Sequence, residues 1–155
     1  MPLNNLTSYL DKNNVKYLII KHSPAYTAQE TAESANILGK ELAKTVILII
    51  DGKMAMAVLP GSYHIDFRLL GEALGATRIS LATEDDFINL FPDCETGAMP
   101  PFGNFYDMDV YVAKSLTEDK EIFFNAGSHS ELIKMAYEDF QKLVKPKIFK
   151  FSEIN

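Results

Sequence analysis

The sequence predicts a mixed α/β domain, in which helices surround a sheet that is not purely parallel. Three observations carry this prediction. The 155 residues suffice for one domain of ordinary size, which we expect to span 1–155 because no repeat and no Gly/Ser/Pro-rich linker divides the chain. Apolar residues make up 47% and charged residues 23%, a balance typical of globular proteins. Helical and strand patterns interleave along the chain with at least one hairpin, which is typical of a mixed sheet.

The N-terminal part is predicted to contain two helices with a strand between them. Apolar residues at helical spacing indicate an amphipathic helix over 3–12. The β-branched and aromatic run 17–21 favours a strand. Thr27 and Glu30 match a capping box, so a second helix should begin there and run to about residue 36.

The strongest strand signal in the chain is the run 45–50, which contains five consecutive aliphatic residues. A run without alternation indicates a strand buried on both faces. Asp51 and Gly52 form a hairpin turn signal, so we expect residues 54–59 to return as the antiparallel neighbour.

Capping residues mark the helices that follow. Asp66 should cap a helix over 67–74, which Gly75 would end in a left-handed conformation. Residues 78–81 favour a short strand, and Thr83 with an acidic residue three positions later opens a short helix that stops at Phe91-Pro92.

The C-terminal part of the chain begins with a long loop, 93–106, that carries two prolines, Pro100 and Pro101, at its centre and two glycines. Loops of this length tend to be functional or mobile. Residues 110–113 and 121–125 are predicted strands. The segment 130–144 allows either one helix or a strand over 132–135 followed by a helix from about residue 138.

Composition narrows the classes of function. The formal net charge of −6 and the pI of about 5.0 argue against tight, sequence-independent binding of nucleic acid, and DNA is not an expected partner. They remain compatible with a protein that grips only the end of an RNA. The longest apolar run is too short to span a membrane, the N-terminus does not resemble a signal peptide, and the single cysteine cannot form an internal disulfide. A cytoplasmic location is therefore expected.

No metal site and no cofactor are expected, because the histidines lack metal-binding spacing and one cysteine cannot build a zinc pattern. His22 is interpreted as a turn residue, His64 as a surface or strand-end group, and His129 as the edge of a site. Ser128 and His129 are adjacent, so in extended chain they point to opposite faces and should not form a nucleophile–base pair. Cys94 lies between two acidic residues, which should raise its pKa and weaken it as a nucleophile.

Two features could carry chemistry. Lys44 lies at the mouth of the most buried strand, where it is either a lysine with its stem on apolar surface or a fixed cation for a phosphate or an oxyanion. The segment 97–103 is stiffened by two prolines and contains two glycines, so it is either a rigid turn or a preformed backbone cradle for a small polar ligand.

An ordered set of short motifs resembles the YbaK family, which includes the editing domain inserted in bacterial prolyl-tRNA synthetases and its free-standing relatives. The motifs are His22-Ser23-Pro24, Thr27 to Glu30, Lys44-Thr45 leading into Val46–Ile50, Met56 to Pro60, Gly97 to Gly103, and Phe124 to His129. They extend over roughly residues 15–145 in the family's order.

The resemblance implies a mixed, barrel-like sheet surrounded by helices. It also implies hydrolysis of the ester that joins a wrong, small amino acid to tRNA, with tRNA-Pro carrying Ala, Cys or Ser as the expected substrate. The implied partners are the acceptor end of the aminoacyl-tRNA and prolyl-tRNA synthetase. The alternatives are a non-catalytic module that binds a small molecule or a tRNA end, and a hydrolase for another small activated ester.

The resemblance also assigns roles to residues. The implied catalytic residues are Lys44, at the entry to the central strand, and Gly97 and Pro101, the ends of a GxxxP loop. The implied substrate-binding residues are Tyr26, Thr45, Ala98, Met99, Pro100, Ser128 and His129. Thr45 stands where some alanine-clearing members carry asparagine, so the preferred amino acid is left open.

Overall fold

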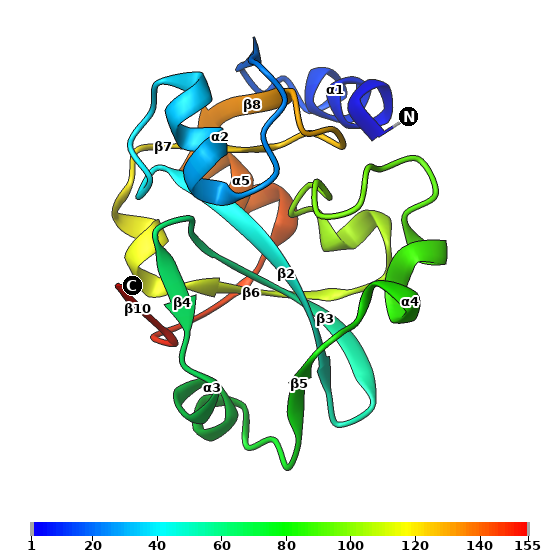
Figure 1. Cartoon of the computed structure of the whole chain (residues 1–155), viewed down its shortest axis with the longest axis vertical. Helices are drawn as coiled ribbons and strands as arrows, with labels where there is room; N and C mark the ends of the chain where they lie inside the picture. The colour runs from blue at the N-terminus through cyan, green and yellow to red at the C-terminus, as the bar shows by residue number, and fades with distance from the viewer. Residues whose placement is uncertain (1, 155) are drawn as a thin grey trace.

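The computed structural model describes the backbone of residues 2–154 and the side chains of residues 5–154. Its centre is an eight-stranded mixed sheet with the order β1-β8-β7-β2-β3-β6-β9, in which β5 also pairs with β2 (Figure 1). The strands of this sheet are β1 (Tyr17–Lys21), β2 (Leu42–Ile50), β3 (Lys53–Pro60), β5 (Ile79–Leu81), β6 (Asp109–Ala113), β7 (Glu121–Asn125), β8 (Glu131–Ala136) and β9 (Lys147–Phe149). The pairs β2–β7, β3–β6 and β6–β9 are parallel and the others are antiparallel, which confirms the predicted mixed sheet.

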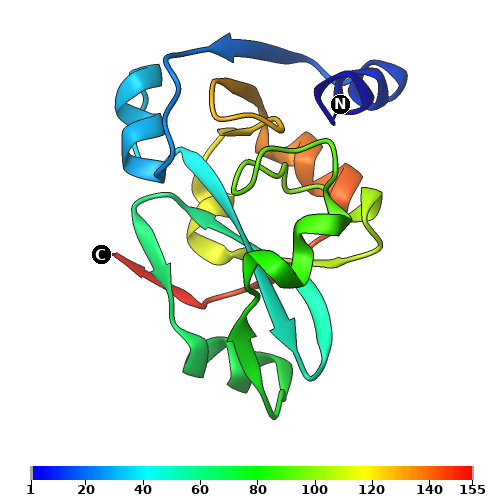
Figure 2. The ribbon, with the colours of Figure 1, turned by 45° about the vertical axis from the view of Figure 1, so that its right-hand side comes forward.

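Helices and a second, two-stranded sheet lie around this centre (Figure 2). The helices are α1 (Pro2–Lys12), α2 (Ala28–Ala35), α3 (Phe67–Leu74), α4 (Glu84–Phe87) and α5 (Tyr137–Val144), with 3-10 turns η1 (Ile88–Leu90), η2 (Gly103–Phe105) and η3 (Lys114–Glu118). The small sheet pairs β4 (Tyr63–Ile65) with β10 (Ser152–Ile154). No helix in residues 2–154 is both long and apolar enough to cross a membrane.

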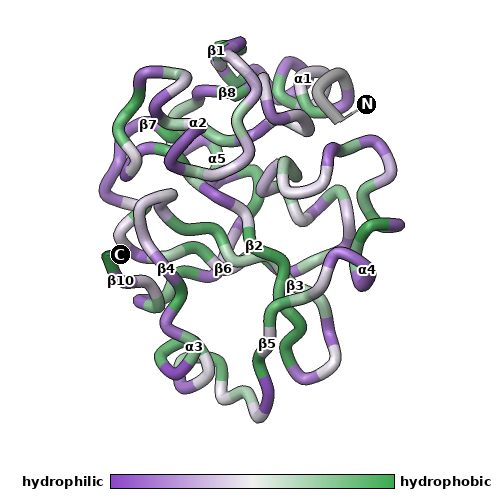
Figure 3. The backbone as a smooth tube through the Cα atoms, in the orientation of Figure 1, coloured by the Kyte–Doolittle hydropathy of each residue, from purple (hydrophilic) through white to green (hydrophobic). Residues whose placement is uncertain are grey.

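The largest core lies inside the curve of the sheet. Strands β2, β3, β6, β7 and β8 all contribute buried side chains to one apolar cluster, together with Leu6 of α1 and Phe140 of α5. Five strands that share one interior are the arrangement of a barrel-like sheet. In Figure 3 the backbone tube is green along most of β2 and β3, which marks their apolar residues in the middle of the molecule.

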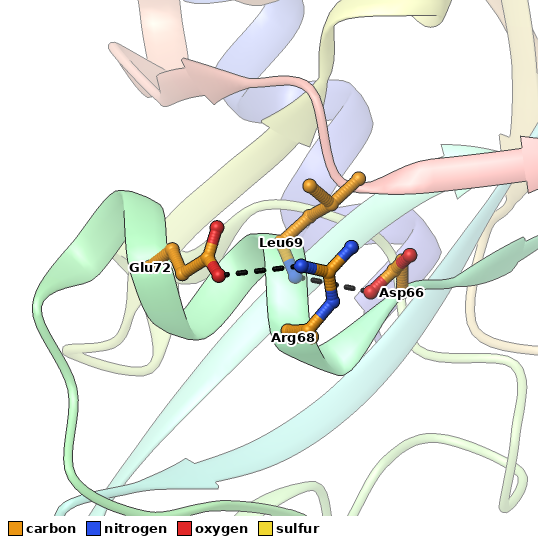
Figure 4. A network of polar contacts seen from close by, with 4 residues as sticks. All are labelled: Asp66, Arg68, Leu69 and Glu72. Carbon is orange, nitrogen blue, oxygen red and sulfur yellow. Dashed lines mark hydrogen bonds and ion pairs between the residues drawn. The ribbon is translucent and has the colours of Figure 1, made fainter.

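The helix boundaries follow from their caps. The Thr27 hydroxyl accepts a hydrogen bond from the amide of Glu30, as half of the predicted capping box. Asp66 accepts one from the amide of Leu69 at 3.0 Å and so begins α3, whose exposed face carries an Arg68–Glu72 ion pair (Figure 4). The helix ends at Gly75 with φ of +64°, as predicted.

One predicted boundary needs correction. Strand β2 begins at Leu42, three residues before the predicted start, because Leu42 and Ala43 are buried beside β7. Of the two alternatives for 130–144, the strand followed by a helix is confirmed, as β8 and α5. The short strands β4, β9 and β10 were not predicted at all.

Candidate functional site

Lys44 is the third residue of β2, not a residue at the mouth of the strand. The side chain is half-buried, and its ammonium donates a hydrogen bond of 3.4 Å to the carbonyl oxygen of Gly61. Burial lowers the pKa of Lys44. A cation held on a central strand with a single long hydrogen bond is available to an anionic or carbonyl group of a ligand.

Lys44 and its neighbour Thr45 point to opposite faces of the sheet, because side chains alternate along a strand. Thr45 shares a face with Ala43 and Ile47, which belong to the large core cluster that Met99 also joins. Lys44 shares its face with Leu42, which packs under α2. The two predicted site residues therefore lie on different faces of β2.

The predicted loop is buried except at its glycine. Ala98, Met99, Pro100 and Pro101 are all buried, with Ala98 completely so. Gly97 is exposed and adopts φ of +86°, a conformation that favours glycine. Within 97–101, Gly97 is therefore the residue that a ligand can approach, and the absence of a side chain allows close contact with its backbone.

His129 is fixed against this loop from two sides. Its ring Nε2 lies 2.7 Å from the carbonyl oxygen of Thr96, and its amide donates to a carboxylate oxygen of Glu95, also at 2.7 Å. A Cβ on Gly97 would lie 3.6 Å from Cε1 of the ring. The side chain is 7% exposed, so the predicted site-edge histidine is a buried, oriented group.

Tyr26 lies between the His129 ring and solvent. Its ring centroid lies 4.8 Å from that of His129, and 72% of its surface is exposed. The amide of Ala25 donates to the carbonyl oxygen of His129, which holds the Tyr26 segment in place. An exposed aromatic ring on a fixed support can stack on a flat ligand group.

The Ser128 side chain points toward Glu131 and not toward His129. Its hydroxyl donates to a carboxylate oxygen of Glu131 at 3.0 Å, and not to the neighbouring imidazole. This agrees with the expectation that Ser128 and His129 do not form a nucleophile–base pair.

Backbone pairing connects Lys44 to the loop. Strand β7 runs parallel to β2 and leads into the turn 125–129, whose Gly127 donates to the carbonyl oxygen of Ala98 and accepts from the amide of Glu95. His129 thus lies against both Tyr26 and Gly97, and Lys44 lies on the strand next to β7. Sequence reasoning did not identify Glu95, whose role as the anchor of His129 is a tertiary contact between residues 34 positions apart.

Cys94 is half-buried beside the loop, with its sulfur 3.7 Å from the hydroxyl of Tyr106. Burial is the main cause that raises the pKa of its thiol, and Asp93 adds to it. The predicted direction is therefore right, but desolvation outweighs the acidic neighbours. A thiol held neutral is a poor nucleophile.

Replacing Cys94 with serine is expected to keep any hydrolytic activity within a fewfold of wild type, because the neutral thiol supplies neither charge nor a nucleophile. The measurement is a rate comparison beside circular dichroism spectra of both proteins. Loss of activity in a folded Cys94→Ser variant would assign the thiol a chemical role.

Among the residues whose placement is described, no three His, Cys, Asp or Glu side chains gather in a way that could hold a metal ion.

Comparisons with known proteins identify related sequences. The family model for the aminoacyl-tRNA editing domain matches residues 22–143. The prolyl-tRNA editing protein ProX of Acetoanaerobium sticklandii is 27% identical over 143 residues, which cover 88% of this chain and 86% of that protein. A proline–tRNA ligase of Staphylococcus epidermidis is 31% identical over 86 residues, 56% of this chain but only 14% of the ligase.

Solved structures show the same fold. A candidate trans-editing enzyme for prolyl-tRNA synthetase superposes with a TM-score of 0.81 at 16% identity, over 98% of this chain and 97% of that one. A hypothetical protein of known structure superposes with a TM-score of 0.85 at 18% identity, over 96% and 99% of the two chains.

The family model covers most of the chain, including Lys44, the 97–101 loop and His129. It confirms both the resemblance and the class of enzyme expected from the motifs. The chain belongs to the family of aminoacyl-tRNA editing domains.

Proposed function

We propose that this protein hydrolyses the ester of mischarged aminoacyl-tRNA in trans, with tRNA-Pro carrying Ala, Cys or Ser as its substrate. The observation that carries the proposal is the contact group of Gly97, His129 and Tyr26 one strand away from the half-buried cation of Lys44. The names of the relatives, a prolyl-tRNA editing protein and proline–tRNA ligases, support the choice of tRNA.

Hydrolysis of an aminoacyl ester does not require a strong nucleophile from the protein. An aminoacyl ester is already activated, so attack by water depends on positioning and on stabilising the oxyanion more than on a strong nucleophile. In the proposed reaction, water adds to the ester carbonyl and the tetrahedral intermediate expels the ribose hydroxyl. The products are the free amino acid and the tRNA with its intact 3′ end.

Each predicted residue has a place in this proposal. Lys44 supplies positive charge to the terminal phosphate or to the polar groups near the ester. The backbone of residues 97–101 orients the aminoacyl group, and its buried side chains keep that backbone rigid. His129 and Tyr26 border the aminoacyl and terminal-nucleotide region, with Thr45 and Ser128 at its margin.

The acidic net charge suits a protein that grips only the acceptor end of the tRNA, where few phosphates need neutralising. Prolyl-tRNA synthetase is the proposed partner that would supply further affinity for the tRNA.

The test is deacylation of a panel of charged tRNAs under identical conditions. We expect hydrolysis of tRNA-Pro charged with Ala, Cys or Ser above the rate without protein, and no acceleration for tRNA-Pro charged with proline. Equal acceleration for every amino acid, or for simple amino-acid esters alone, would contradict the proposed substrate.

Gly97→Val is expected to reduce turnover about tenfold. A β-branched residue is strained at φ of +86°, and its methyl groups would press on the His129 ring, which an added Cβ already approaches to 3.6 Å. The measurements are deacylation rates and the free energy of unfolding.

Gly52 provides a matched control, because it has almost the same φ, +85°, in the β2–β3 turn, and a Cβ there would meet nothing within 4 Å. Gly52→Val should show a similar loss of stability, about 1–2 kcal/mol, with normal turnover. Equal activity of the two variants would mean that residue 97 is only a structural turn.

A further inference from the structure

A buried hydrogen-bond acceptor lies beside Lys44. The side-chain oxygen Oδ1 of Asn125 has almost no exposed surface and accepts no hydrogen bond within the described part of the chain. Burying such an oxygen without a donor costs about 1–3 kcal/mol, so the few that persist in folded proteins require a physical reason.

The strand register places Asn125 next to Lys44. In the parallel pair β2–β7, Leu42 lies opposite Phe123 and Ala43 lies opposite Phe124. Extending this register by one position places Lys44 beside Asn125, the last residue of β7. Neighbouring strands lie about 4.8 Å apart, which brings the two side chains within reach of each other.

Both side chains extend from the same face of the sheet. Leu42 and Phe123 belong to one apolar cluster, together with Leu132, which pairs with Asn125 on β8. Lys44 and Asn125 each follow a member of this cluster by two residues, and residues two apart on a strand share a face. The Lys44 ammonium, which has three N–H donors, and the Asn125 oxygen, which lacks a donor among the described residues, therefore lie on the same face of neighbouring strands.

We propose that Asn125 is a positioning residue for Lys44, whose ammonium donates a hydrogen bond to Oδ1 of Asn125 in the arrangement that meets the substrate. The proposal rests on the function proposed above. An ammonium has three donors, and the bond to Gly61 is long at 3.4 Å, so a second acceptor can be added. An amide oxygen orients the cation without neutralising it, which leaves the positive charge for the substrate.

The titration of Lys44 reports this contact directly. Burial alone lowers the pKa of Lys44, without a contribution from a neighbouring charge. The titratable groups on the elements around it are Glu30 and Glu33 on α2, Lys40 and Glu41 before β2, Glu118 at the end of η3 and Asp119 after it, Glu121 on β7, and His22 beyond β1. On the two strands that flank Lys44, the neighbouring positions are Leu59 on β3 and Asn125 on β7, and neither side chain carries a charge. A charge introduced at residue 125 would therefore lie on the strand directly beside Lys44.

The experiment is an NMR titration of the Lys44 side chain in protein labelled with 13C-lysine, assigned with a Lys44→Arg variant. Asn125→Asp, which keeps the side-chain shape, is expected to raise the pKa of Lys44 by about one unit or more, as an opposite charge within about 4–6 Å does. Asn125→Leu is expected to lower it. In deacylation assays Asn125→Leu should reduce kcat about tenfold with little change in KM, because the cation is misplaced and not removed.

Tyr137→Phe is the matched control, because it removes another buried polar atom without a partner among the described residues, on the opposite side of the sheet in the large core cluster. It should leave the pKa of Lys44 and the rate unchanged. An unchanged pKa of Lys44 in Asn125→Asp would overturn the proposal. Since the titration uses no substrate, a responsive pKa in a protein without deacylation would contradict the proposed function and leave the contact intact.

Discussion

Replacing Lys44 with alanine is expected to slow deacylation of mischarged tRNA about a hundredfold. Removing a fixed charge that stabilises the transition state costs on the order of 3 kcal/mol. The free energy of unfolding should change by roughly 0.5 kcal/mol or less, because the ammonium makes one long hydrogen bond and its burial disfavours the charged form. Rates and unfolding curves of the same preparations separate the two effects.

Lys134 is a suitable control for Lys44. It is a partly buried lysine on β8, with 29% of its side chain exposed, and its ammonium is paired with Glu121 at 3.5 Å. Lys134→Ala should retain normal turnover. Lys44→Arg should recover activity only in part, because the broader guanidinium places its donors elsewhere. A folded Lys44→Ala variant at nearly the wild-type rate would remove Lys44 from the site.

Replacing Gly103 with alanine is expected to destabilise the protein by about 3 kcal/mol, the largest effect on stability that we predict for a single methyl group. The added Cβ would overlap the carbonyl oxygen of Met108 and lie 2.5 Å from Cγ2 of Val110. The backbone of the loop must move to relieve these contacts, and overpacking of this kind costs about 1–3 kcal/mol or more. Urea unfolding measures the loss.

Gly71→Ala is a control in which the same added methyl group should stabilise the protein. Gly71 lies inside α3, and a Cβ there would meet only Ile79 at an ordinary 3.8 Å. Alanine is favoured over glycine in a helix by roughly 0.5–1 kcal/mol, so this variant should be more stable than wild type. Equal stability of the two variants would show that the end of the 97–103 loop is less tightly packed than the structure indicates.

Local sequence signals predicted most of the fold correctly. The Asp51-Gly52 turn and the aliphatic run before it identified the β2–β3 hairpin, since both are decided by residues adjacent in sequence. The caps at Asp66 and Thr83 predicted where α3 and α4 begin. Each of these features depends on backbone groups within a few residues.

The missed elements depend on distant partners. Strand β9 forms because Lys147 to Phe149 pair with β6, and β10 forms because it pairs with β4, some ninety residues earlier in the chain. Three-residue strands carry too little periodicity to be recognised alone. The position of Lys44 inside β2 likewise depends on β7, which buries Leu42 and Ala43.

The candidate site was predicted as a set of residues but not as an arrangement. The resemblance named Tyr26, Gly97 and His129, and in the structure His129 lies against each of the other two. The anchoring of His129 by Glu95 and the burial of the Asn125 oxygen without a donor among the described residues are tertiary facts with no local signal. A buried acceptor can be recognised only when its surroundings are known.

The central claim is that the protein turns over a mischarged tRNA and does not merely bind it. The most direct measurement is a single-turnover reaction, with protein in excess over alanyl-tRNA-Pro, in which bound and hydrolysed fractions are followed in the same samples. We predict that the bound ester disappears far faster than in buffer and that free alanine and intact tRNA appear together. Stable binding with hydrolysis at the rate of the buffer blank would contradict the account and would identify the chain as a binding module.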